Sequence, residues 1–147
     1  MSFLDRFKIQ PKYKSQDPEV RLAAVREYNA ASATDEEQAA IVALAREDAD
    51  ARVRRAAADR IDDASVLASL ASAEADEGVR SEILDRLAGI AVSSTSADAA
   101  LAALGALREP KPIGNVAKSS PIDSVRMEAV NRLTDLKTLS SVARTKV

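Results

Sequence analysis

The chain contains no cysteine, no histidine and no tryptophan among its 147 residues. Without Cys and His it cannot form disulfides, Ser–His or Cys–His nucleophilic sites, or metal centres with thiolate or imidazole ligands. It also has only four glycines, and none forms a glycine-rich loop of the kind that holds phosphate groups. These absences exclude the common catalytic classes. We therefore expect a protein that is not an enzyme and that carries no metal or other cofactor.

Aromatic side chains and long hydrophobic runs are also scarce. The chain has two phenylalanines and two tyrosines and is rich in alanine, which favours thin helix–helix contacts over a thick globular core. No apolar stretch is long enough for a signal peptide or a membrane span. We therefore expect a cytoplasmic protein that has no membrane partner.

Charge is nearly balanced over the chain but is unevenly distributed. Residues 1–16 carry four basic and one acidic residue, residues 17–110 carry ten and nineteen, and residues 111–147 carry seven and three. The corresponding net charges of +3, −9 and +4 add up to the −2 of the whole chain. An acidic central region disfavours polyanions and suits a basic partner.

A Val-Arg pair recurs four times, each time at the start of a segment with helical periodicity. Counted from the Val as position zero, apolar residues follow at positions four, five and eight, which share one face of a helix. A second helical segment ends in an Ala that stands eight residues before the next Val. The four pairs are Val20-Arg21, Val53-Arg54, Val79-Arg80 and Val125-Arg126.

This spacing predicts an all-α, right-handed solenoid of about four stacked helix pairs in one domain, residues 1–147. Repeat 3 has 38 residues between its Val and its last Ala, whereas repeats 2 and 4 have 18, so we expect an inserted helix at about 97–108. The predicted segments are a cap helix and link over 1–16, repeat 1 over 17–49, repeat 2 over 50–75, repeat 3 over 76–120 and repeat 4 over 121–147.

Individual helix boundaries are also predictable. Asp17 before Pro18 is typical of a helix start, and Thr34 with Glu37 predicts a capping box. The next Val after repeat 4 would fall beyond Val147, and no polar cap follows that helix, which favours a chain that continues.

The repeat motif resembles a known family. The pattern D-P-x-V-R-x-x-A over residues 17–24, and D-x-x-V-R over 50–54 and 76–80, resembles HEAT-like repeats, in particular the short repeats of phycobilisome lyases. The fourth repeat departs from it, since Ile122 occupies the Asp position. The first seven residues look like the start of bacterial HEAT-repeat proteins that carry a further, uncharacterised helical domain. The resemblance implies a fold more than a function.

The Arg of each pair, together with the Asp three residues before the Val, predicts a structural ladder along successive helix starts. Buried Arg–Asp contacts with two parallel hydrogen bonds are a common structural use of Arg. An anion-binding role is the alternative. The ladder residues are Asp17, Arg21, Asp50, Arg54, Asp76, Arg80 and Arg126.

Two further groups are candidates for a partner surface. Leu101, Leu104 and Leu107 form a stripe on the inserted helix, which we expect to pack back onto the solenoid rather than stay exposed. Arg52 and Arg55 belong to the densest basic cluster, but acidic neighbours surround it and no aromatic residues interleave with it, so nucleic acid is an unlikely ligand.

We therefore predict a non-enzymatic scaffold that binds an unidentified protein. Two alternatives stay open. One is a chaperone-like subunit of the bilin-lyase type, which would need a pocket wide enough for a tetrapyrrole. The other is a HEAT-like module that binds nucleic acid, as some basic solenoids do.

Overall fold

The computed structural model describes residues 12–145, with burial and side-chain facts up to residue 137. All regular structure in this part of the chain is helical, without any β-strand. The predicted cap helix near the N-terminus lies outside the described residues. No helix within them is long and apolar enough to cross a membrane.

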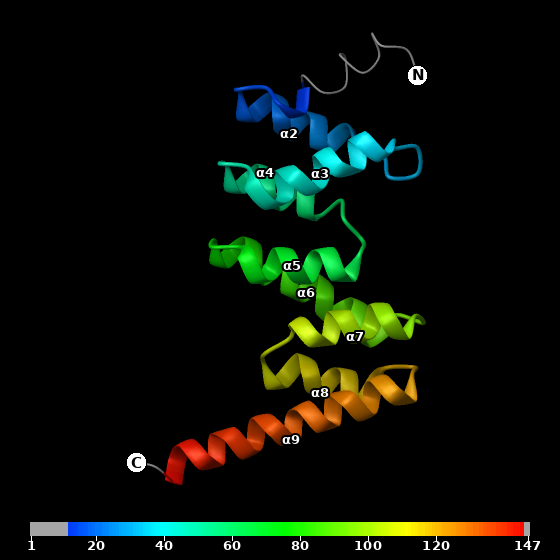
Figure 1. Ribbon diagram of the computed structural model, residues 1–147, viewed down its shortest axis with the longest axis vertical. Helices are drawn as coiled ribbons and strands as arrows, with labels where there is room; N and C mark the ends of the chain where they lie inside the picture. Colours follow the sequence, from blue (N-terminus) through cyan, green and yellow to red (C-terminus); the bar gives the residue numbers. More distant parts are fainter. Residues whose placement is uncertain (1–11, 146–147) are drawn as a thin grey trace. The chain divides into compact units, whose positions relative to one another are not determined.

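Eight helices follow one another along the described chain (Figure 1). Their bounds are α2 (Pro18–Glu27), α3 (Asp35–Glu47), α4 (Ala51–Ala58), α5 (Ala64–Ala73), α6 (Glu77–Ser93), α7 (Ala97–Ala106), α8 (Pro110–Ser119) and α9 (Asp123–Thr145). They divide between two compact units, and the division passes through α5 and α6. Helices α2 to α4 belong wholly to the first unit and α7 to α9 wholly to the second.

The predicted helix starts are confirmed. Asp17 caps α2, where its side chain accepts a hydrogen bond from the Glu19 N–H, and Pro18 occupies the first turn. Thr34 and Glu37 form the predicted capping box of α3, in which each side chain accepts from the other residue's backbone. These caps satisfy backbone donors that a helix leaves free at its N-terminus.

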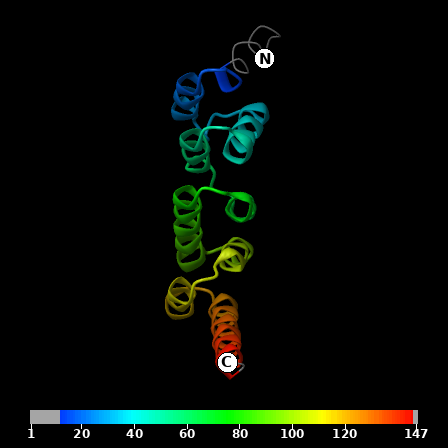
Figure 2. The same ribbon diagram turned by 90° about the vertical axis from the view of Figure 1, so that its left-hand side faces the viewer.

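In the first unit, α4 packs against both α2 and α3. Figure 2 shows α2 and α4 on one side of this unit and α3 on the other. Val25, Ile41 and Val53 have almost no exposed surface and form the centre of its core. Arg60 of the α4–α5 connection donates to the Arg26 carbonyl at the end of α2, with a distance of 3.2 Å.

The second unit repeats this arrangement with α9 in the place of α4. Helix α9 packs against α8, to which it runs antiparallel, and also contacts α7. Arg132 of α9 donates to the carbonyls of Leu104 and Leu107 at the end of α7, the second at 2.5 Å. Arg60 and Arg132 each stand seven positions after a repeat Val, and in both units this arginine binds the end of an earlier helix, which is α2 for Arg60 and α7 for Arg132.

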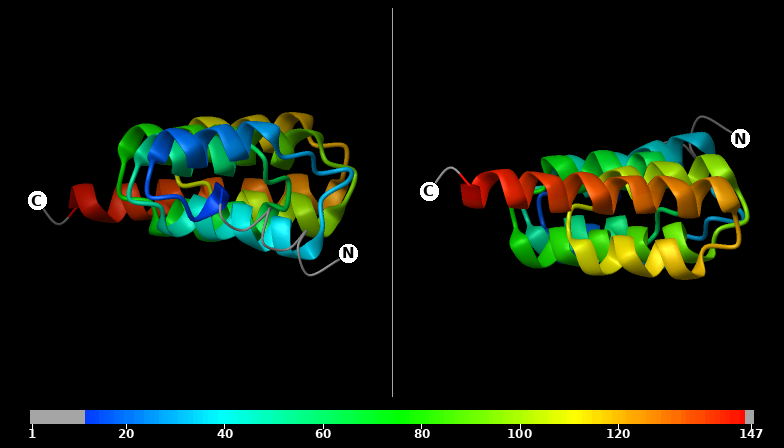
Figure 3. Two further views of the ribbon diagram at one scale, coloured as in Figure 1. Left: turned by 90° about the horizontal axis from the view of Figure 1, so that it is seen from above. Right: turned by 90° about the horizontal axis from the view of Figure 1, so that it is seen from below.

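Repeat 4 differs from the prediction, because a single helix replaces the expected helix pair. Helix α9 continues without a break from Asp123 to Thr145 and extends past the end of α8 (Figure 3, right). The stretch 133–138 contains no Gly, no Pro and no adjacent acidic pair. By contrast, Asp62 and Asp63 lie in the turn between α4 and α5, so nothing comparable ends α9 midway.

Five helices begin with the same local hydrogen bond. A side-chain oxygen accepts from the backbone N–H two residues later, at 2.9–3.2 Å. In four cases the acceptor stands five residues before a repeat Val, and in the fifth it stands five residues before Ala99 of α7. The acceptor and donor pairs are Ser15–Asp17, Asp48–Asp50, Glu74–Asp76, Ser94–Ser96 and Ser120–Ile122.

The stripe on α7 is largely buried. Leu104 and Leu107 are 1% and 2% exposed, whereas Leu101 remains 37% exposed. The prediction that the stripe packs against the rest of the protein is therefore confirmed for Leu104 and Leu107, which offer no surface to a partner. Of the three leucines, Leu101 alone is accessible.

Leu104→Ala should destabilise the protein by about 2–5 kcal/mol, because it removes a fully buried side chain and leaves a cavity. Leu101→Ala on the same helix is the matched control and should change the free energy of unfolding by less than about 1 kcal/mol. Chemical denaturation of both variants measures the difference. Equal effects would mean that α7 does not contribute Leu104 to a packed core.

Candidate functional site

Arg21 forms the best-satisfied ion pair of the first unit. Its Nε and Nη2 atoms donate to the two carboxylate oxygens of Asp48 at 2.7 and 3.1 Å. Its Nη1 atom donates to the carbonyl oxygen of Ser15 at 2.6 Å. The Arg21 and Asp48 side chains are only 14% and 4% exposed, so water contributes little to their solvation. The hydrogen bond to Asp48 raises the pKa of Arg21, which stays charged.

Arg54 repeats this geometry one repeat later. Its Nε and Nη2 atoms donate to the Glu74 carboxylate at 2.9 and 3.1 Å, and its Nη1 atom donates to the Asp48 carbonyl at 2.8 Å. Asp48 is therefore a junction, since its side chain binds Arg21 and its backbone binds Arg54. Two-point pairing between a planar guanidinium and a carboxylate fixes orientation as well as distance.

The acidic partners of the ladder differ from the predicted ones. Asp17, Asp50 and Asp76 accept backbone hydrogen bonds at helix starts, whereas the carboxylates that bind Arg21 and Arg54 belong to Asp48 and Glu74. The partner therefore stands five residues before the next Val, not three. This signal was present in the sequence, where that position holds Ser, Asp, Glu and Ser in front of the four Val residues.

The other two arginines lack this pairing. Arg80 is exposed, and the residue five positions before Val125 is Ser120, which has no charge. Arg126 donates to the Ser120 carbonyl at 2.6 Å and pairs with the exposed carboxylate of Asp123, three residues away in its own helix. The ladder in the described chain is thus carried by Arg21 and Arg54.

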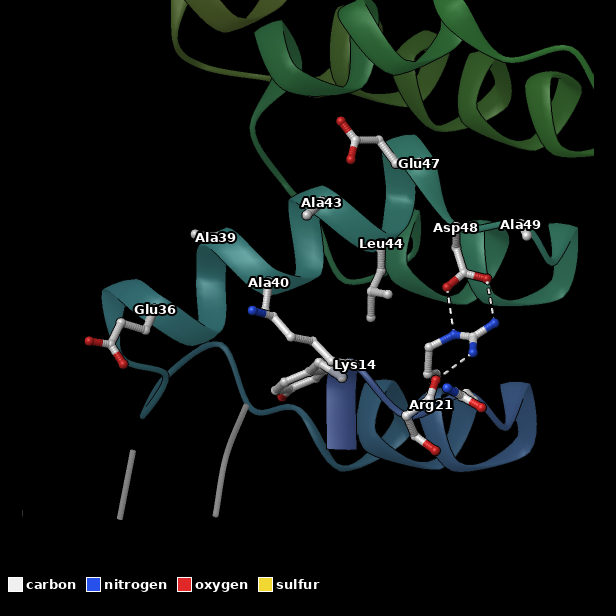
Figure 4. Close-up of a pocket in the computed structure, with 13 residues that line it drawn as sticks. Lys14, Arg21, Glu36, Ala39, Ala40, Ala43, Leu44, Glu47, Asp48 and Ala49 are labelled. Atoms are coloured by element: carbon white, nitrogen blue, oxygen red, sulfur yellow. Dashed lines mark hydrogen bonds and ion pairs between the residues drawn. The ribbon is translucent and has the colours of Figure 1, made fainter. Parts of the chain in front are cut away.

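A groove of about 780 Å³ lies beside this ladder in the first unit. One wall is the face of α3 that carries Ala39, Ala40, Ala43 and Leu44, and the other is the segment 13–16 before α2. Figure 4 shows Arg21 and Asp48 at one end of the groove, with the Lys14 amine reaching toward Ala40. Because the alanine side chains end at Cβ, the α3 backbone is accessible to an incoming chain.

The charged residues at the groove are three acids, Glu36, Glu47 and Asp48, and two cations, Lys14 and Arg21. Glu36 and Glu47 lie eleven residues apart on α3, about 16 Å along a helix, and both are exposed. Tyr13 is buried at 8% exposure. Burial, reinforced by the Glu37 carboxylate, raises the pKa of Tyr13 and keeps the phenol neutral. The groove therefore offers small apolar side chains, with the Glu36 and Glu47 carboxylates at the two ends of its α3 wall and the Lys14 amine beside Ala40.

The predicted basic cluster forms a second, more polar surface between α2 and α4. Four arginines, Arg26, Arg52, Arg55 and Arg60, line it together with the two acids Glu19 and Asp59. The Arg52 side chain is 59% exposed and pairs with Glu19 at 2.8 Å and with Asp50 at 2.9 Å. Its charge is thus already balanced within the protein.

A metal site would require a group of ligating side chains among the described residues. Within residues 12–145, no group of three or more acidic side chains is placed to hold a metal ion. When the chain is compared with protein-family models, curated proteins and solved structures, none of them matches it. A functional interpretation must therefore rest on the geometry of these surfaces.

Arg54→Ala should destabilise the protein by roughly 1–3 kcal/mol, because it leaves the buried Glu74 carboxylate without its charged partner. Arg52→Ala, two residues away, removes an exposed arginine and should leave the thermal midpoint unchanged. Thermal unfolding followed by circular dichroism compares the two variants. A wild-type midpoint for Arg54→Ala would show that its hydrogen bonds contribute nothing net to stability.

The Glu74 carboxylate should make stability depend on pH. Burial alone would raise the pKa of Glu74, but hydrogen bonds from Arg54 and from the Asp76 and Ala75 backbone outweigh it and lower the pKa below its ordinary 4.5. The stabilisation is therefore present above pH 4.5 and is lost as the pH falls through the folded-state pKa. The difference in unfolding free energy between wild type and Glu74→Gln should shrink as the pH falls through the folded-state pKa of Glu74.

Denaturant titrations at a series of pH values measure this difference. The same comparison in an Arg54→Ala background is the control, and there the difference should change less with pH because the charged partner is absent. A difference that does not change with pH in the wild-type background would contradict the ion-pair assignment.

Proposed function

We propose that this protein is a non-enzymatic HEAT-like repeat module that binds a basic protein segment in the α3 groove. The observation that carries this proposal is the groove itself, in which alanine side chains lie between Glu36 and Glu47 on a helix braced by the ladder. Residues 17–110, which include the α3 wall of the groove but not the wall formed by residues 13–16, have a net charge of −9. An acidic setting of this kind attracts a basic partner and steers its approach.

The repeat architecture in this proposal is a right-handed solenoid with five repeat starts rather than four. Ala99 becomes the additional start, because Ser94 and Ser96 before it form the recurring hydrogen bond. Ala99 also stands eight residues after the buried Ala91 and 18 before Ala117, as in other repeats. Under this assignment α7 and α8 form a repeat of their own, and the long α6 carries both halves of repeat 3.

The ladder supports a binding role because it preorganises the groove. Asp48 follows the last residue of α3 and is tied to α2 through Arg21 and to α4 through Arg54. The wall that would receive a partner is therefore fixed before binding, which reduces the entropy lost on association.

The partner that fits this groove is a helix with small or short apolar side chains and two basic residues eleven positions apart. That spacing places both cations on one face and matches Glu36 and Glu47. Close helix–helix approach over alanine is compatible with the exposed Ala39 and Ala43. We place this interaction in the cytoplasm.

The two alternatives have less support. A tetrapyrrole pocket would need broad apolar walls, but the aromatic residue at this groove is Tyr13, which is almost fully buried. A nucleic-acid surface would need unbalanced cations, but Arg52 already pairs with two carboxylates.

A labelled alanine-based helical peptide with two lysines eleven positions apart is a suitable probe, and fluorescence anisotropy measures its binding. Ala43→Trp should weaken binding at least about tenfold, or roughly 1.4 kcal/mol, because it fills the groove. Gln38→Trp is the matched control. Gln38 is exposed on the same helix but is not part of the groove, so this variant should bind like wild type.

A peptide with glutamates in place of the lysines should not bind. Equal binding of both peptides, or equal loss in both tryptophan variants, would contradict the proposal. Binding of duplex DNA tighter than roughly 10⁻⁶ M at physiological salt, with a steep loss on adding salt, would instead support the nucleic-acid alternative.

A further inference from the structure

A regular stripe of exposed side chains runs along α9. Asp123, Met127, Val130, Thr134 and Lys137 follow one another at spacings of four, three, four and three residues, so they lie on one face of the helix. All five are exposed. Met127 is 67% and Val130 50% exposed, the two highest values among the large hydrophobic residues described. The stripe therefore has an apolar centre and charged ends.

The same position is buried after three of the other repeat starts and partly buried after Val79, where it is Leu84. Val130 stands five residues after Val125, and the residues five after Val20 and Ala99 are Val25 and Leu104, with exposures of 0% and 1%. The helices of Val25 and Leu104 are each contacted by a later helix, α4 and α9 respectively. Val130 thus has the chemical character of a covered position. Figure 3 (right) shows α9 in front of α7 when viewed from below, with α8 beside α9.

In a pair of identical α9 helices, the charged ends of the two stripes attract each other only when the helices are antiparallel. If two copies of α9 lie antiparallel about a two-fold axis at Val130, each Asp123 lies near the Lys137 of the other copy. Asp123 already pairs with Arg126 of its own helix, but its side chain is 86% exposed and can accept from a second cation. Met127 then lies near Thr134, and the two Val130 side chains meet at the axis. A parallel arrangement would place Asp123 beside Asp123 and Lys137 beside Lys137, which like-charge repulsion disfavours.

We propose that α9 mediates an antiparallel homodimer of this chain through the stripe from Asp123 to Lys137. A symmetric contact of this kind uses the same residues on both copies, so no additional complementary surface is required. It is independent of the α3 groove and goes beyond the function proposed above.

The contact should be weak. The segment from Asp123 to Lys137 is about 21 Å long, and it offers only two large apolar side chains. The buried area is therefore below the roughly 800 Å² per partner of a stable interface. We expect a dissociation constant on the order of 10–100 µM, in the range of transient complexes.

Sedimentation velocity of the full chain, over a concentration range that brackets this constant, tests the proposal. Wild type should shift from monomer to dimer as its concentration rises. Val130→Lys should remain monomeric throughout, because it places two cations together at the axis. Asp135→Lys introduces the same side chain outside the stripe, at an exposed position of the same helix, and should dimerise like wild type.

Charge reversal supplies a test that loss of folding cannot imitate. Asp123→Lys and Lys137→Glu should each weaken dimerisation at least about fivefold, whereas the double variant should recover it, because the double exchange restores opposite charges at both ends. Circular dichroism confirms that each variant is folded. A wild type that stays monomeric, a dimer that survives Val130→Lys, or a double variant without recovery would overturn the proposal.

Discussion

The first unit depends on the hydrogen bonds that converge on Asp48. The Asp48 carboxylate accepts two hydrogen bonds from Arg21 and one from the Asp50 backbone N–H. The Asp48 carbonyl oxygen accepts one more from Arg54. A buried charge is stable only when its hydrogen-bonding capacity is filled. The position where α3 ends and α4 begins is therefore tied to the position of α2. Any change in the relative placement of these helices would leave charged atoms without partners.

The groove follows from this constraint. Its wall on α3 is held at one end by the Asp48 junction, and its opposite wall, residues 13–16, is held by the Ser15 carbonyl that Arg21 binds. Arg21 and Asp48 satisfy each other at one end of the groove, and Glu36, Glu47 and Lys14 are its other charged lining residues.

The basic cluster and α9 use their side chains differently. At the surface between α2 and α4, Arg52 pairs within the protein with Glu19 and Asp50. On α9, in contrast, Met127 and Val130 are exposed although the repeat pattern places an apolar residue at the second of these positions for burial.

The sequence by itself determined the helical class, the repeat spacing and the helix starts, because these follow from local periodicity and from capping side chains such as Asp17 and Thr34. Only the tertiary structure decided which acid each arginine binds, since Asp48 lies 27 residues from Arg21 and Glu74 lies 20 from Arg54. Local patterns cannot reveal a pairing that depends on how helices stack. Tertiary packing also decided that Leu104 is buried and Leu101 is not, and it placed the walls of the groove side by side. These outcomes depend on contacts between segments far apart in the chain, which spacing alone does not specify.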